Sequence, residues 1–460
     1  MIKRFLFIFA AILAFCMLPS VALGLGTAEV NASPTIRVLI DSSSSSDLFS
    51  FTVTNGTYYI VDESSINGSN YYKSSMSAYE KKTAGSTFTL TAGSGRIAMP
   101  ENKDCTCRYG SYSYRGAFKA LIYGSYRYAI NQVDVEIYLY GVVGNEIGSF
   151  NTPSMEAQAV AARSYAIGNI SSSHKYYDVT NTISSQVYHG YSSETASIRE
   201  AVDNTRGWVL AYNGAIIETY YSSSHGGHSE NIENVWVSDD VPLVGVPCPY
   251  DKVAGTTDYG SYAASCWSWT VEYTPDNLVS LANSYGGTDI GDFVSISMSK
   301  TYNGKTSVSG RAMQVTIKGT KGSVTATKDN IRSLLNLKST LFTISNSEGT
   351  AASTYVIGKG NKLSSWETLT GLYAQSGSGS VVLAGGSNDT IYVLSADGKN
   401  QLSKSGVING GNIVINGYGY GHGVGMSQWG AIAMGDNGYT WQEIIDLFYC
   451  RGGVQMIDCY

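Results

Sequence analysis

Residues 134–170 read DVEIYLYGVVGNEIGSFNTPSMEAQAVAARSYAIGNI, and this stretch predicts two helices in succession. Asp134 can cap the first helix, because its side chain can accept hydrogen bonds from the free amides of the first turn. Thr152-Pro153 pairs an N-cap residue with a proline at the first helical position, which predicts a second helix over 154–170. The apolar face of the first helix comprises Val135, Leu139, Val142 and Val143.

The sequence on both sides of these helices favours strands. Residues 36–61, 86–145 and 340–417 alternate apolar and polar side chains, as half-buried strands do. Together with the helices, this pattern predicts an α+β fold in which strand-rich lobes surround a few short helices. The predicted segments are strand-rich 33–130, helical 131–205, mixed 206–340, strand-rich 341–417 with Gly/Ser turns at 376–379 and 385–387, and a Gly-rich loop with C-terminal helices over 418–460.

Local signals place the remaining elements. Asn213-Gly214 between 208–212 and 215–221 is a strong hairpin signal, because both residues accept positive φ. Further helices are predicted over 193–204, from Thr274-Pro275, from Thr327, over 427–434, and over 441–449 after the capping box of Thr440 and Glu443.

Composition excludes some classes of function. The 460 residues carry 30 Lys and Arg against 36 Asp and Glu, and the formal net charge is −6. No basic run extends beyond Lys81-Lys82, so we expect no nucleic-acid partner, which would need a dense cationic surface. The 35 Tyr residues suit sugar binding, although packing within strands explains them at least as well.

The N-terminus has the pattern of an export signal. Lys3-Arg4 precede an apolar run over 5–18, and small residues follow. Residues 1–25 are therefore predicted to be a signal peptide or, if uncleaved, an N-terminal anchor. Either case predicts an extracytoplasmic protein, secreted or held at the outer face of the membrane.

Six cysteines follow the signal segment, and an even number outside the cell permits disulfides. The economical local pairs are Cys248–Cys266 and Cys450–Cys459, whereas Cys105 and Cys107 could pair with each other only under strain. Free thiols are the alternative. No CxxC pair is present, so a structural zinc is not indicated.

Two polar loops contain most of the histidines. Residues 222–228 follow the predicted hairpin, and 417–428 is a Gly-rich turn that leads into a helix, whose first amides are free donors. The Gly-rich turn lacks the spacing and the Lys of a phosphate loop, and no Gly-x-Ser-x-Gly elbow is present. His225 and His228 could bind a metal, but no third ligand is suitably spaced.

Glu146 is the candidate acid. It lies at the end of the first apolar helix and just before the alanine-rich helix. A carboxyl group enclosed by apolar side chains has a raised pKa and can keep its proton near neutral pH. Such a group can protonate a glycosidic oxygen, although a Glu at a helix end is more often structural.

Four segments resemble the stage II sporulation protein D family of peptidoglycan lytic transglycosylases and related modifier proteins. The order and spacing of the segments also agree, and the resemblance spans a domain predicted over 33–455. The matching segments are YLYGVVxNE at 138–146, AQAVAARSYA at 157–166, YSSSxGG at 221–227 and GYGHGVGMSQWGA at 419–431.

The resemblance implies a glycan-binding cleft framed by the lobes. It also implies cleavage between N-acetylmuramic acid and N-acetylglucosamine without water, which leaves 1,6-anhydromuramoyl ends. Glu146 matches the family's catalytic glutamate and would act first as acid and then as base, so no second carboxylate is needed. Arg163 could position a substrate oxygen or hold a carboxylate. Substrate hydrogen bonds would come from Ser223, Ser224, His422 and Gln428.

The sequence departs from the family pattern in two places. Glu156 stands where the family usually has Lys, which reverses a charge that we expect near the site. Some members bind zinc through His and Cys residues before a Gln-Val-Tyr segment. In this sequence His174 is the one residue at those positions that could still bind zinc. We therefore predict no metal and no cofactor. The positions of the other ligands hold Thr180, Ser184 and Ser185.

The sequence thus predicts an exported lytic transglycosylase, a carbon–oxygen lyase, that acts on peptidoglycan strands, with a preference for strands stripped of stem peptides. The alternative is a non-catalytic glycan-binding modifier of a cell-wall amidase, which would then be a partner. A Tyr-rich adhesin is a third hypothesis, but it leaves the ordered motifs unexplained. Membrane contact is expected only with an uncleaved N-terminal segment. The sequence leaves open a sporulation or a vegetative role.

Overall fold

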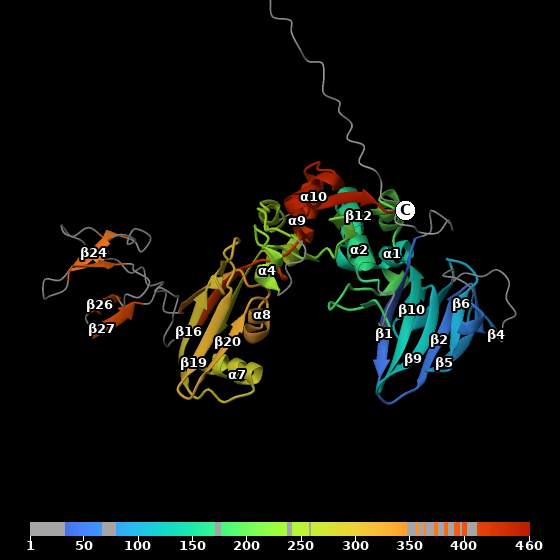
Figure 1. The fold of residues 1–460 in the computed structure, drawn as a ribbon, viewed down its shortest axis with the longest axis horizontal. Helices are drawn as coiled ribbons and strands as arrows, with labels where there is room; N and C mark the ends of the chain where they lie inside the picture. Colours follow the sequence, from blue (N-terminus) through green and yellow to red (C-terminus); the bar gives the residue numbers. More distant parts are fainter. Residues whose placement is uncertain are drawn as a thin grey trace, which may run out of the picture.

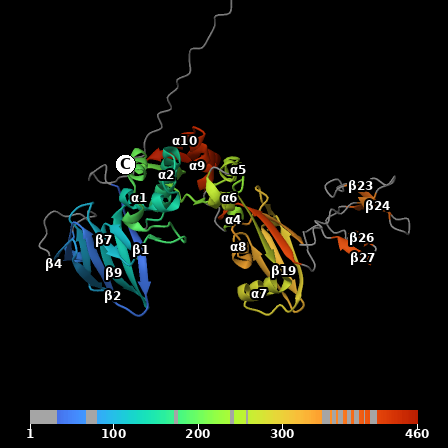
Figure 2. The ribbon, with the colours of Figure 1, turned by 180° about the vertical axis from the view of Figure 1, so that it is seen from behind.

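The computed structural model describes residues 33–66, 80–170, 176–236, 242–256, 259–346 and 412–460, with six short strands between 356 and 402 described by their backbone alone. Most strands gather in two lobes, and most of the longer helices lie between them (Figures 1 and 2). The α+β class predicted from the sequence is confirmed. The predicted domain boundaries stay a prediction.

The first lobe consists of two antiparallel sheets around an aromatic core. One sheet has the order β11-β1-β10-β9-β6-β3-β4, with β11 parallel to β1, and the other has the order β5-β2-β7-β8. Phe51 and Phe118 join the two sheets with their ring centroids 4.9 Å apart. The strands are β1 (Thr35–Ser43), β2 (Leu48–Asn55), β3 (Thr57–Asp62), β4 (Glu80–Thr83), β5 (Thr87–Thr91), β6 (Arg96–Pro100), β7 (Thr106–Tyr109), β8 (Tyr112–Arg115), β9 (Ala117–Tyr123), β10 (Tyr126–Asp134) and β11 (Val179–Thr180), with the short helix η1 (Glu63–Ser65) after β3.

The two predicted helices are present with one change of cap. Asp134 ends β10 and caps α1 (Val135–Glu146), since its carboxylate accepts from the amides of Glu136 and Ile137. The cap of α2 (Thr152–Gly168) is Asn151 and not Thr152, because the Asn151 side chain accepts the Ser154 amide at 3.0 Å. The predicted helix over 193–204 is α3 (Ala196–Asn204), and η2 (Gly190–Ser193) precedes it.

The predicted hairpin forms but is shorter than expected. Asn213 (φ 51°) and Gly214 (φ 79°) make the turn between β12 (Trp208–Tyr212) and β13 (Ala215–Ile216). The chain then leaves this sheet, and β14 (Tyr221–Ser222) pairs in parallel with β29 (Met426–Ser427). This pairing brings the two polar loops, 222–228 and 417–428, side by side.

The second lobe is built on two small antiparallel sheets, with orders β16-β19-β20 and β15-β28-β21. The helix predicted from Thr327 begins later, at α8 (Asn330–Leu335). Thr327 is still part of β20, where it pairs with Gln314 of β19, and Lys328 has a positive φ of 54°. The elements are α4 (Ile232–Val235), α5 (Tyr250–Ala254), α6 (Gly260–Trp267), β15 (Ser268–Tyr273), α7 (Pro275–Gly286), β16 (Phe293–Ser299), β17 (Thr301–Tyr302), β18 (Lys305–Thr306), β19 (Gln314–Gly319), β20 (Ser323–Thr327), β21 (Phe342–Asn346) and β28 (Ile413–Tyr418).

The C-terminal helices return to the middle of the molecule and pack on α2 (Figure 1). Ser427 caps α9 (Gln428–Asp436), and the predicted capping box of Thr440 and Glu443 starts α10 (Trp441–Phe448). After η4 (Arg451–Gly453), β30 (Gln455–Asp458) pairs with β12. The backbone-only strands are β22 (Val356–Ile357), β23 (Leu363–Ser364), β24 (Leu372–Gln375), β25 (Val381–Ala384), β26 (Ile391–Ser395) and β27 (Gly398–Leu402).

The remaining sequence expectations concern the signal segment, the Gly/Ser turns and the cysteines. The signal segment, 1–25, and the turns at 376–379 and 385–387 lie outside the described residues. No helix in the described ranges is long and apolar enough to cross a membrane. The pairs Cys248–Cys266 and Cys450–Cys459 are not formed, since all six cysteines are free in this structure.

Candidate functional site

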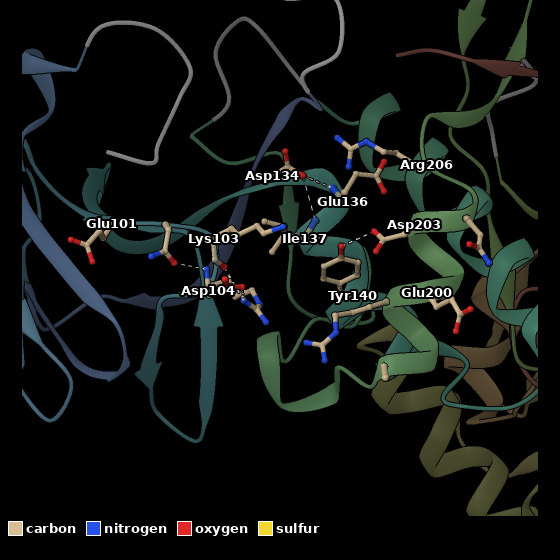
Figure 3. A pocket seen from close by; sticks show the side chains of 15 residues that line it. Glu101, Lys103, Asp104, Asp134, Glu136, Ile137, Tyr140, Glu200, Asp203 and Arg206 are labelled. Atoms are coloured by element: carbon tan, nitrogen blue, oxygen red, sulfur yellow. Dashed lines mark hydrogen bonds and ion pairs between the residues drawn. The ribbon is translucent and has the colours of Figure 1, made fainter. Parts of the chain in front are cut away.

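A cavity of about 1000 Å³ opens between the first lobe and α3, and its lining is rich in charged side chains (Figure 3). Several of its acids already have partners within the fold. Asp134 caps α1, Asp203 accepts the Tyr140 hydroxyl at 2.7 Å, and Glu136 is bound by a buried arginine. None of the predicted site residues lines this cavity, so the candidate active site lies elsewhere.

A second cavity, of about 560 Å³, contains Glu146 and is called the Glu146 cavity below. Its volume falls in the usual range for small-ligand sites. Three further predicted site residues line it, although they are distant in sequence: Ser223 from the segment after β14, His422 from the Gly-rich loop and Gln428 from α9. The pairing of β14 with β29 brings these segments together.

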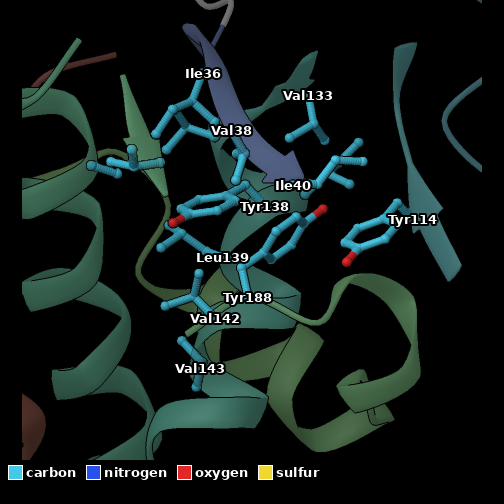
Figure 4. Close-up of a cluster of buried hydrophobic side chains, with 14 of the residues drawn as sticks. Ile36, Val38, Ile40, Tyr114, Val133, Tyr138, Leu139, Val142, Val143 and Tyr188 are labelled. Atoms are coloured by element: carbon cyan, nitrogen blue, oxygen red, sulfur yellow. The ribbon is translucent and has the colours of Figure 1, made fainter. Parts of the chain in front are cut away.

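The position of Glu146 depends on the core beneath α1. Tyr138 of α1 packs against Tyr188 with ring centroids 4.7 Å apart, and β1 covers both rings (Figure 4). The neighbouring Gln186 accepts the Tyr138 hydroxyl at 3.1 Å. Because both flanking residues are fixed in this way, the Val187 amide is presented to Glu146 Oε1, to which it donates at 2.8 Å.

The surroundings of the Glu146 carboxyl group shift its pKa. Burial raises its pKa above the ordinary value. The hydrogen bonds from Val187 and from Gln428 Nε2 (3.3 Å to Oε2) lower the pKa, but they do not cancel the effect of burial. The raised pKa that the sequence predicted is therefore present, and the carboxyl group lines the cavity.

Gln428 links Glu146 to α2. Its Nε2 also approaches Gln158 Oε1 at 3.5 Å, and both glutamines are buried. The backbone before Gln428 is fixed because Ser427, which caps α9, donates its hydroxyl to the buried Asp251. The geometry gives Gln428 a direct role in setting the protonation of Glu146.

Replacing Gln428 with Met is expected to raise the pKa of Glu146 further, because a hydrogen bond to the ionised form is lost. Carbon-13 NMR titration of the Glu146 carboxyl would measure the change. Gln455→Met, an exposed change on β30, is the matched control and should leave the titration unchanged. An unchanged or lowered pKa in Gln428→Met would contradict this role.

His422 lines the cavity, but its ring nitrogens are engaged with the backbone. Nδ1 accepts the Val424 amide at 3.1 Å, so the proton resides on Nε2, which donates to the Tyr221 carbonyl at 3.0 Å. Burial, followed by the charge of Arg332, lowers the pKa of His422 to about 3. His422 is therefore neutral and shapes the Gly-rich loop. The expected hydrogen bond to a sugar would require one of these contacts to break.

The two predicted serines are placed differently. Ser223 lines the cavity, whereas Ser224 is only 1% exposed and does not line it. Ser224 forms a backbone bridge with Tyr420, and its Oγ accepts the Gly226 amide at 3.3 Å. Successive residues of an extended segment point to opposite sides, which explains why only one serine lies at the site. Substrate binding by Ser224 stays a prediction, and the described lining of the cavity includes Ser223 and not Ser224.

Arg163 holds a carboxylate, which was one of its two expected roles, and it does not line the Glu146 cavity. Its side chain is 0% exposed and forms a two-pronged pair with Glu136, at 2.7 and 2.8 Å. The remaining N–H groups donate to the carbonyls of Trp208 and Val202. Glu156, expected near the site, accepts from Asn204 and also does not line the cavity.

The donor set of the family's zinc site is not retained. Thr180, Ser184 and Ser185 present hydroxyls, and Thr180 Oγ1 donates to Ser185 Oγ at 3.3 Å, so thiolate ligands are replaced by groups that bind zinc poorly. His174 lies outside the described residues. Within the described ranges, no group of three His, Cys, Asp or Glu side chains could hold a metal.

Sequence reasoning missed the aromatic and cationic parts of the cavity. Trp236 connects Tyr220 with His422, at ring-centroid distances of 4.7 and 4.9 Å. The high Tyr content suggested sugar binding without locating it, and no sequence signal indicated Arg332, which comes from α8. The aromatic residues of the lining are Tyr165, Tyr220, Tyr221, Trp236, Tyr262 and Tyr420.

Comparisons with known proteins find family models and relatives that match parts of this chain. Residues 123–212 match the family model described as Stage II sporulation protein, and 251–361 match a domain of unknown function, DUF8618. An uncharacterized protein of Brachyspira hyodysenteriae is 28% identical over 75% of this chain and 72% of its own length. The amidase enhancer of Bacillus subtilis is 28% identical over 68% of this chain, and stage II sporulation protein D of that organism is 30% identical over 28%. These alignments span only 39% and 43% of the two Bacillus proteins.

Proposed function

Residues 123–212 belong to the stage II sporulation protein D family, as the motifs predicted, and from this premise we propose that the chain is a peptidoglycan lytic transglycosylase. It acts outside the cytoplasm on the glycan of the cell wall. The observation that carries the proposal is the environment of Glu146, a carboxyl group with a raised pKa that lines a cavity with aromatic side chains.

The proposed reaction uses one carboxyl group twice. Protonated Glu146 donates its proton to the oxygen that links muramic acid C1 to the next sugar, and the C1–O bond breaks. The resulting carboxylate then accepts the proton of the C6 hydroxyl as O6 bonds to C1, which closes a 1,6-anhydro ring. Water is neither consumed nor released, and Glu146 ends in its starting state.

The composition of the cavity supports a lyase over an ordinary hydrolase. Hydrolysis by either common glycosidase route uses two carboxyl groups at the scissile bond. Among the described residues that line the cavity, Glu146 is the single carboxylic acid. The aromatic rings offer flat apolar faces with polar edges, which suit the faces of pyranose rings.

The test is mass spectrometry of peptide-free glycan strands incubated with the full chain. Fragments that end in 1,6-anhydromuramic acid would support the lyase. Fragments with reducing ends would instead indicate a hydrolase and overturn the waterless step.

A second candidate is a non-catalytic glycan-binding modifier of a cell-wall amidase. The specific observation in its favour is the alignment with the amidase enhancer, which covers 68% of this chain. Strands that are bound but not cleaved, together with faster cleavage by an added cell-wall amidase, would select this function over the lyase.

A further inference from the structure

Arg332 is a cation in the Glu146 cavity that comes from the second lobe. It belongs to α8, inside the region that matches the domain of unknown function, whereas Glu146 belongs to α1. Among the described residues that line the cavity, Arg332 is the single Lys or Arg, and the neighbouring His422 is neutral. The cavity therefore has one fixed positive charge.

The fold holds Arg332 at the cavity while leaving donors for a ligand. Ile331, Leu334 and Leu335 are fully buried and anchor α8 to its lobe. Arg332 Nη1 lies 3.2 Å from Asp329 Oδ2, a partner on the same turn. The Arg332 side chain stays 27% exposed, and among the described residues its Nη2 has no hydrogen-bond partner, whereas its Nε is buried without one. A guanidinium has five donors, and Asp329 engages only one of its nitrogens.

Three other cationic side chains of the second lobe already donate hydrogen bonds to backbone carbonyls. Lys328 Nζ donates to the carbonyls of Glu233 and Trp236, and Lys338 Nζ donates to the carbonyl of Ser265. Arg311 is buried and donates to the carbonyl of His225. None of these three side chains belongs to the described lining of the cavity.

The charge of Arg332 affects the pKa of His422. It is the second cause of the lowered pKa of His422, after burial, whereas the pKa of Glu146 responds to burial, Val187 and Gln428. The charge of Arg332 is thus coupled to His422, whereas the pKa of Glu146 has other causes. Its loss is expected to change binding more than the protonation of Glu146.

We propose that Arg332 binds a carboxylate on the glycan, namely the lactyl carboxylate of a muramic acid from which the peptide has been removed. This inference rests on the proposed function. Guanidinium groups pair with carboxylates through two parallel hydrogen bonds, which fixes both position and orientation. In a strand that keeps its peptide, the same carbonyl group is a neutral amide, so the pair cannot form. Arg332 would then be the residue that produces the preference for stripped strands expected from the sequence.

The experiment measures binding separately from cleavage. Dissociation constants are measured for three ligands: peptide-free strands, the same strands with lactyl carboxylates converted to methylamides, and N-acetylglucosamine oligomers. The Glu146→Gln background prevents turnover. We expect that background protein to favour the carboxylate-bearing strands by about tenfold or more, and Arg332→Gln to remove most of that preference.

The controls separate charge recognition from a structural effect. Arg108→Gln removes an exposed arginine of β7 outside the cavity lining and should keep the preference. Arg332→Lys keeps the charge and should retain part of it. An unchanged preference in Arg332→Gln, or an equal loss for all three ligands, would overturn the inference. If carboxylate preference depends on Arg332 while the unsubstituted chain cleaves nothing, the lyase fails and this inference stands.

Discussion

Glu146→Gln is expected to lower glycan cleavage by about 10³-fold or more, because the variant can neither donate nor accept the proton that the reaction needs. Binding of glycan strands should change by less than about threefold, since Gln nearly preserves the shape of the side chain. Counting 1,6-anhydromuramoyl ends by mass spectrometry measures the first effect, and dissociation constants measure the second.

The matched control for this variant is Glu156→Gln. Glu156 also has a pKa raised by burial, yet it lies outside the cavity lining and accepts from Asn204. Its replacement should leave cleavage within about twofold. If Glu146→Gln kept a tenth of the activity, or if Glu156→Gln lost as much, the assignment of the acid would be wrong.

The raised pKa of Glu146 also has consequences for pH and stability. As the acid, Glu146 must be protonated in the free protein, so cleavage should fall as pH rises through its pKa. A folded-state pKa above the unfolded value contributes stability below the unfolded pKa, and this contribution is lost as pH rises through the folded pKa. Gln cannot ionise, so the stability of Glu146→Gln should depend less on pH over this range than that of the original chain.

Arg163→Met is expected to lower the free energy of unfolding by about 3–5 kcal/mol. The substitution leaves Glu136, which is 1% exposed, charged and without its main partner. Denaturation by urea, followed by circular dichroism, would measure the loss. Because Arg163 does not line the Glu146 cavity, protein that remains folded should bind glycan as tightly as before.

Two comparisons test the origin of this loss. Arg199→Met removes an arginine that is 40% exposed and pairs with Glu194 at 3.3 Å, so it should cost no more than about 1 kcal/mol. Adding Glu136→Leu to Arg163→Met removes the isolated charge and should recover part of the stability. Weaker glycan binding with unchanged stability in Arg163→Met would instead support a substrate contact.

The sequence predicted the parts of the site that depend on local patterns. Asp134 and the capping box at Thr440 fix helix starts through contacts within three residues, and both are present. The enclosure of Glu146 also follows from its place at the end of an apolar helix. Where two cap residues compete, as at Asn151 and Thr152, a local pattern does not decide, because the backbone conformation selects the donor.

Other parts of the site depend on contacts between distant segments, and these the sequence did not predict. Ser223 and Ser224 are identical in type, and only the bridge to Tyr420 determines which one lines the cavity. The Nε2 of His422 is hydrogen-bonded to the carbonyl of Tyr221, which is 201 positions away in the sequence. Arg332 reaches the cavity only because the second lobe packs beside the Gly-rich loop.

The pairing of β14 with β29 has a consequence for the order of events during synthesis. Glu146 receives its hydrogen bond from a glutamine 282 positions later in the chain. The contacts that complete its surroundings are therefore among the last to become available as the chain emerges, and closing so long a loop is slow. An unfinished chain carries Glu146 without Gln428, so the hydrogen bond between them can form only after residue 428 has been delivered.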